Sequence, residues 1–137
     1  MKTFDFEKGY LLDTHTFLWA IKAPNRLGKM AHSIIENPET RLYLSSISAF
    51  ETTNKYRLAK LDAAYESIVK NYTQFAQQLG VEDLPLTLAH THLAGSMDWS
   101  HRDPFDRFIV AQASLENLTV ITDDAQIKNH PWIDSVW

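Results

Sequence analysis

The chain has 137 residues, of which 45% are hydrophobic and 22% charged, and its formal net charge is −4. This length and composition predict a single globular domain, residues 1–137, with a core of its own. The absence of cysteine excludes disulfides and thiolate metal sites, and the negative charge weakly disfavours a nucleic-acid partner.

The chain carries no sign of a membrane or secretory segment. No apolar run approaches the roughly 18 residues that a membrane span needs. The first 13 residues, MKTFDFEKGYLLD, place acids where a signal peptide has its apolar run. We therefore expect a cytoplasmic protein.

The N-terminal third alternates between strand and helix patterns. The apolar run of residues 10–12 predicts a buried strand that ends at Asp13. Thr14 is expected to cap a helix over residues 15–21. Residues 27–35 form a second amphipathic pattern before Asn37-Pro38, and the RLYL segment, residues 41–44, predicts a second strand.

Residues 45–61 predict a helix with two possible starting points. Ser48 and Glu51 have the spacing of a capping box, which would make Glu51 part of the helix start. Alternatively the helix begins at Ser45 or Ser46, and Glu51 then faces another part of the molecule. Glu51 and Lys55 also have the i,i+4 spacing of a helical ion pair.

Three weaker patterns fill the middle of the chain. They are a helix over residues 63–79 closed by Gly80, an edge strand over residues 84–86, and a helix capped by Thr87 that ends at Gly95.

The segment HRDPFDRFIVAQA, residues 101–113, predicts a buried helix with an acidic start that runs to about Leu115. Asp103 is the expected N-cap, a proline follows it, and Asp106 lies in the first turn. Both acids could serve purely as caps that complement the helix dipole. Residues 118–122, LTVIT, then form the clearest buried strand before Asp123 and Asp124, and a short last strand is expected over residues 132–136.

Alternating strands and helices predict a three-layer α/β/α fold around a central, mainly parallel sheet. Its carboxyl edge, where such sheets bind ligands, would gather acids from four separate segments. Carboxylates packed together repel one another, and a hard cation such as Mg²⁺, or Mn²⁺ in its place, relieves that repulsion. Such a site can activate water for phosphodiester cleavage.

Four motifs, LLDTH, SAFE, RDPFDRFIVAQA and ITDD, resemble the PIN-domain family along essentially the whole chain. More narrowly they resemble VapC-type toxin ribonucleases of type II toxin–antitoxin systems. The resemblance assigns the catalytic acids to Asp13, Glu51, Asp106 and Asp124, with Asp13, Asp106 and Asp124 as metal ligands. Two further residues are auxiliary candidates. Asp103 would be an extra metal ligand or the helix cap, and His101 would contact the scissile phosphate or hydrogen-bond a loop carbonyl. Asp123 stands where the family often has a basic residue, so Asp123 and Asp124 both remain candidates for the fourth acid.

The resemblance implies an Mg²⁺-dependent endoribonuclease that leaves a 5′-phosphate and a 3′-hydroxyl. It also implies a homodimer, an RNA substrate and a co-encoded antitoxin that lies across the active-site groove. The alternative is a catalytically silent PIN-like module that binds RNA or protein. A haloacid-dehalogenase-like phosphatase is disfavoured because His15 stands where its second acid belongs, and a receiver domain because acids follow the late strand instead of a lysine.

Overall fold

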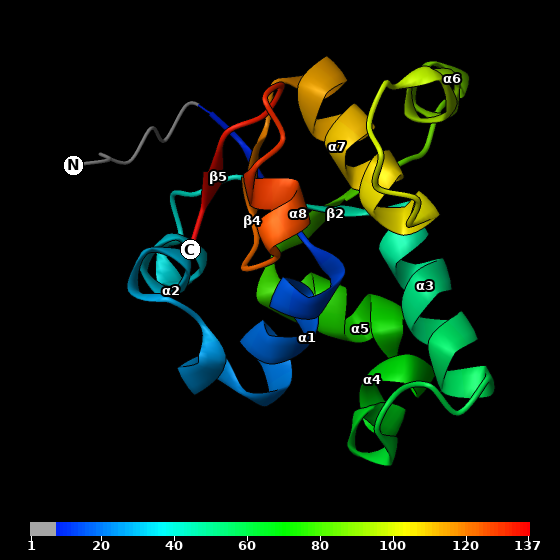
Figure 1. Cartoon of the computed structure of the whole chain (residues 1–137). Coiled ribbons are helices and arrows are strands. Elements are labelled where there is room, and N and C mark those ends of the chain that lie inside the picture. Colours follow the sequence, from blue (N-terminus) through cyan, green and yellow to red (C-terminus); the bar gives the residue numbers. More distant parts are fainter. Residues whose placement is uncertain (1–7) are drawn as a thin grey trace.

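The short apolar runs of the chain form a parallel sheet, shown in the computed structural model of Figure 1. The structure describes residues 8–137. Residues 1–7 lie outside the described residues, and so does the part of the signal-peptide argument that rests on their acids. Within this part all strand pairs are parallel, in the order β3-β2-β1-β4-β5. The strands are β1 (Tyr10–Leu12), β2 (Leu42–Ser45), β3 (Val81–Leu84), β4 (Thr119–Ile121) and β5 (Ser135–Val136).

Helices cover both faces of the sheet, which confirms the predicted three-layer α/β/α fold. Figure 1 shows α1, α2 and α5 on one side of the strands and α6 and α7 on the other. The helices are α1 (Thr14–Lys22), α2 (Lys29–Glu36), α3 (Ser46–Arg57), α4 (Glu66–Lys70), α5 (Tyr72–Leu79), α6 (Leu88–Ser96), α7 (Pro104–Glu116) and α8 (Ala125–Lys128), with short 3-10 turns at Pro24–Arg26 and Ala63–Tyr65.

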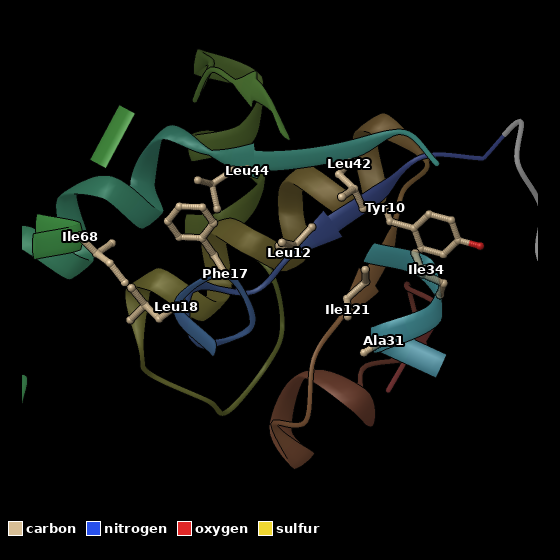
Figure 2. Close-up of a cluster of buried hydrophobic side chains, with 10 residues drawn as sticks. All are labelled: Tyr10, Leu12, Phe17, Leu18, Ala31, Ile34, Leu42, Leu44, Ile68 and Ile121. Carbon is tan, nitrogen blue, oxygen red and sulfur yellow. The ribbon is translucent and has the colours of Figure 1, made fainter. Parts of the chain in front are cut away.

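Successive residues of each strand point to opposite faces and build two separate cores. Leu12 joins the core that α1, α2, α4 and α5 cover, whereas its neighbour Leu11 joins the core under α6, α7 and α8. Figure 2 shows Phe17 of α1 directed toward Leu12 and Leu44 of the sheet, and all three are buried. Burial of each such side chain contributes about 1.5–3 kcal/mol, so these contacts fix the positions of the strand ends.

The predicted helix starts at Asp103 and Thr87 are confirmed, but the predicted cap of the first helix was wrong. The Asp13 side chain accepts from the Thr14 N–H, so Asp13 caps α1 and Thr14 is its first residue. The Thr14 hydroxyl instead donates to Ser48 Oγ at 2.9 Å and joins α1 to α3.

The capping box of Ser48 and Glu51 was also wrong, and the alternative reading of this helix is confirmed. Ser45 caps α3 through a bond from Ile47 N, and Glu51 lies well inside the helix. The helix ends at Arg57 rather than near residue 61, because Ala59 has a positive φ of 57°.

The structure corrects several other boundaries. The helix expected over residues 63–79 is interrupted at Asn71, where φ is −128° and ψ is 39°, outside the helical range. The edge strand ends before Pro85 instead of including it. Helix α6 continues through Gly95, β5 is shorter than expected, and α8 was not predicted.

None of the helices within residues 8–137 is both long and apolar enough to cross a membrane.

Substitution of glycine by alanine is expected to have opposite effects on stability at Gly80 and Gly95. A Cβ at Gly80 or at Gly95 would meet no atom within 4 Å, but Gly80 has a φ of 82° whereas Gly95 lies inside α6. We expect Gly80→Ala to lower the free energy of unfolding by about 1 kcal/mol and Gly95→Ala to raise it by about 0.5–1 kcal/mol. Urea unfolding measures both values, and equal effects would contradict the assigned backbone conformations.

Candidate active site

Acids from separate segments meet at the carboxyl edge of the sheet, beside the central strands. Strand β1 lies between β2 and β4, so the chain changes direction across the sheet at the gap between β1 and β4. Ligands of open α/β sheets bind at such a point. A hollow of about 160 Å³ opens there, lined by Asp13, His15, Thr16, Trp19, Asp123 and Asp124.

Asp13 is held rigidly at the end of β1. Its Oδ1 accepts from the Thr14 N–H at 2.8 Å, and its Oδ2 accepts from the Thr122 hydroxyl at 2.9 Å. Burial raises the pKa of Asp13 above its ordinary value despite these hydrogen bonds, and the charge of Glu51 adds to the rise. A positive ion at this carboxylate would therefore favour its ionised form.

Asp106 lies in the first turn of α7 in contact with His101, and its pKa is raised. His101 Nε2 lies 2.6 Å from Asp106 Oδ2. Burial raises the pKa of Asp106 to about 7, opposed by the His101 bond and assisted by the charges of Asp103, Asp13 and Asp124. Near neutral pH the site therefore holds a proton that a cation could displace.

Asp103 combines two features that the sequence presented as alternatives. Its Oδ1 caps α7 by accepting from Phe105 N at 2.9 Å and from Asp106 N at 3.3 Å. One side-chain atom each of Asp103, His101 and Asp106 also lie within 4.8 Å of one another, which is close enough to share a metal ion.

Glu51 is buried inside α3 and faces a lysine. Its side chain is 8% exposed, and its Oε2 accepts from Lys55 Nζ at 2.6 Å, the predicted i,i+4 ion pair. Burial lowers the pKa of Lys55, but the bond to Glu51 and the charges of Glu51, Asp103 and Asp106 outweigh this effect and raise it. Lys55 thus supplies positive charge to acids of both α3 and α7.

Asp124 and Asp123 differ in their surroundings. Asp124 caps α8, since its Oδ1 accepts from Gln126 N at 2.8 Å, and its own N–H donates to the Thr122 hydroxyl at 3.0 Å. Thr122 therefore connects Asp124 to Asp13. Asp123 has a half-exposed side chain, 4.0 Å from Lys128.

The structure thus divides the residues expected from the sequence among three places. Asp13, Asp123 and Asp124 line the hollow, His101, Asp103 and Asp106 lie close together at the start of α7, and Glu51 is paired on α3. Two further residues, Thr122 and Lys55, contact these acids. Thr122 was visible as the threonine two residues before an acid, and Lys55 as an ion-pair partner of Glu51. The acids offer oxygen ligands of the type that Mg²⁺ prefers.

Arg107 holds the loop that carries His101, a role that the sequence analysis missed. Its guanidinium donates to the carbonyls of Ala94, Met97, Trp99 and His101 at 2.6–3.0 Å. The Trp99 ring also lies 4.9 Å from the His101 ring. These contacts fix His101 over the start of α7.

Residues 10–133 match the sequence profile of the PIN domain. No curated protein matches the chain.

Three similar solved structures are of proteins bound to DNA. VapBC2 from Rickettsia felis bound to a fragment of its promoter is 19% identical, with a TM-score of 0.66, and covers 93% of this chain and 98% of that chain. DNA-bound VapBC from Salmonella typhimurium is 20% identical, with a TM-score of 0.68 and coverages of 94% and 97%. FitAB bound to the IR36 DNA fragment is 20% identical, with a TM-score of 0.56 and coverages of 93% and 93%. These likenesses show the fold.

The pKa of Asp106 predicts a pH-dependent effect of Asp106→Asn on the metal-free protein. The folded chain keeps the Asp106 proton up to about pH 7, whereas the unfolded chain releases it near its ordinary value of 3.8. Wild type is therefore expected to lose stability relative to Asp106→Asn as the pH rises between these values. Melting temperatures in EDTA should be similar near pH 4 and increasingly favour the variant toward pH 8.

Asp98→Asn removes one negative charge from an exposed position and serves as the control. A difference between Asp106→Asn and wild type that does not change with pH would contradict a raised pKa at Asp106.

Proposed function

Since this chain belongs to the PIN-domain family, we propose that residues 1–137 act as one Mg²⁺-dependent endoribonuclease domain, the VapC-type toxin of a toxin–antitoxin pair. The observation that carries the proposal is the coupling of carboxylates from distant segments: the charges of Asp13, Asp103 and Asp124 help to raise the pKa of Asp106 to about 7. Acids held together in this way are typical of a cation site.

The donor set fits Mg²⁺ better than a softer metal. Asp13, Asp106 and Asp124 would hold the ion through carboxylate oxygens, and Mn²⁺ could take its place. Such an ion, when bound, would supply Lewis acidity and lower the pKa of a water molecule. Asp124 is favoured over Asp123 as the fourth acid because its charge acts on Asp106 and because Thr122 connects it to Asp13.

The chain's own residues would then orient the reactants and accept the proton. Glu51 is bonded through Oε2 to Lys55, which leaves Oε1 to accept a proton from the attacking water. Thr122 holds one oxygen of Asp13 in place. His101 and Asp103 would have auxiliary roles at the start of α7, where His101 fixes the orientation of the Asp106 carboxylate.

The partners of the proposed activity are an RNA substrate, an antitoxin and a second copy of the chain. The similar fold of the VapBC and FitAB structures supports the toxin assignment and hence the antitoxin. Size-exclusion chromatography with light scattering tests the homodimer. A catalytically silent PIN-like module is the second candidate, and it is disfavoured because all four acids that the family resemblance assigns are present in this chain.

Cleavage of structured RNAs by the purified protein tests the proposal. We expect cleavage with Mg²⁺ or Mn²⁺, none in EDTA, and 5′-phosphate ends at the mapped sites. Asp13→Asn and Glu51→Gln should each reduce the rate by at least about 100-fold, as loss of a catalytic acid or base does, while the protein stays folded. Asp98→Asn should cleave like wild type.

Two results would contradict the proposal. RNA binding by wild type without cleavage under any of these metal conditions would favour the silent module. Full activity of Asp13→Asn or Glu51→Gln would remove that residue from the catalytic site.

A further inference from the structure

Two phenylalanines lie at the rim of the carboxylate site and belong to neither core. Phe50 directly precedes Glu51 on α3, and Phe105 directly precedes Asp106 on α7. Their ring centroids are 6.1 Å apart with a 40° tilt. Neighbouring helical residues point about 100° apart, so the rings flank the acids instead of pointing with them.

Phe50 of the aromatic pair is open to solvent, whereas Phe105 is half-buried. Phe50 is 56% exposed, and neither ring takes part in the two buried clusters of the described residues. The fold therefore gains little from the Phe50 ring, although an exposed phenylalanine lowers solubility. A ligand that covers the pair would recover the apolar area.

Positive charge lies next to the pair. Lys55 Nζ is 5.9 Å from the centroid of the Phe105 ring. Arg102, which directly precedes Asp103, is exposed and makes no hydrogen bond or ion pair with the described residues 8–137. Lys55 is paired with Glu51, so Arg102 is the cation left to attract a phosphate. Aromatic rings beside such a cation fit a nucleotide, because the rings stack on its base and the cation attracts its phosphate.

We propose that the Phe50–Phe105 pair stacks the base of the nucleotide next to the scissile phosphate, and that Arg102 binds a flanking phosphate. This inference rests on the proposed ribonuclease function and names positioning residues for it. A base can stack on the pair only when it is free of its duplex neighbours, so the bound nucleotide is unpaired.

A second copy of the chain is the less suitable occupant. Stable protein interfaces bury about 800 Å² on each partner. Two phenylalanine side chains bury about 150–250 Å² each, which falls short of that area. The small apolar area and the unpaired Arg102 both favour RNA.

Kinetics with a short stem–loop RNA test the proposal through four variants. Phe50→Ala and Phe50→Leu should raise KM by about 5- to 150-fold, the range expected for loss of one stacked base, with little change in kcat. Phe50→Trp should restore a KM near that of wild type. Leu115→Ala removes a similarly exposed apolar side chain, 49% exposed, from the other end of α7 and should behave like wild type.

Binding without cleavage gives an independent readout. Anisotropy of labelled RNA with Asp13→Asn should show tighter binding than with Asp13→Asn/Phe50→Ala by a similar factor. Arg102→Gln should weaken binding and reduce its salt dependence by about one phosphate contact.

Unchanged RNA affinity after Phe50→Ala, or a Phe50→Leu variant equal to wild type, would overturn the stacking role even if wild type cleaves RNA. Lost activity that accompanies a changed oligomeric state would assign the pair to contact between copies of the chain and would also overturn it. If wild type neither binds nor cleaves RNA, the proposed function fails and this inference fails with it.

Discussion

Repulsion between carboxylates at one sheet edge is the constraint to which the rest of the structure responds. Three aspartates, Asp13, Asp103 and Asp124, use one oxygen each, Oδ1, to accept from the first N–H groups of α1, α7 and α8. Helix starts carry partial positive charge and stabilise anions there. Capping and a site role are therefore compatible, because the second oxygen of each carboxylate is free of its helix.

The energy that holds these acids together comes from contacts made by other residues. Two apolar cores on either face of the sheet fix the ends of β1 and β4. On α7, Arg107 ties the preceding loop to the helix through four carbonyls. Lys55 is positioned on α3 to offset negative charge from two helices. These contacts thus hold the acids close together against their mutual repulsion.

Local patterns predicted the layers, the parallel sheet and the convergence of acids, because buried strands and helix caps have strong short-range signals. The caps at Asp103 and Thr87 followed from adjacent residues, whereas the cap at Asp13 did not, since the Thr14 hydroxyl bonds Ser48 more than 30 residues away. The interruption at Asn71 likewise has no local signal, because it lies within an otherwise regular helical pattern. The coupling between Asp106 and the other acids arises from tertiary proximity, which no single segment of the sequence encodes.

The central claim is that the cation displaces a proton from coupled acids. Calorimetry tests it most directly, by measuring the heat of Mg²⁺ binding to wild type in buffers of different ionisation enthalpy. With the pKa of Asp106 near 7, binding should release about half a proton or more at pH 7, close to one at about pH 6 and almost none at pH 9. Heats that do not depend on the buffer at pH 6 and 7, or no Mg²⁺ binding at all, would contradict the account.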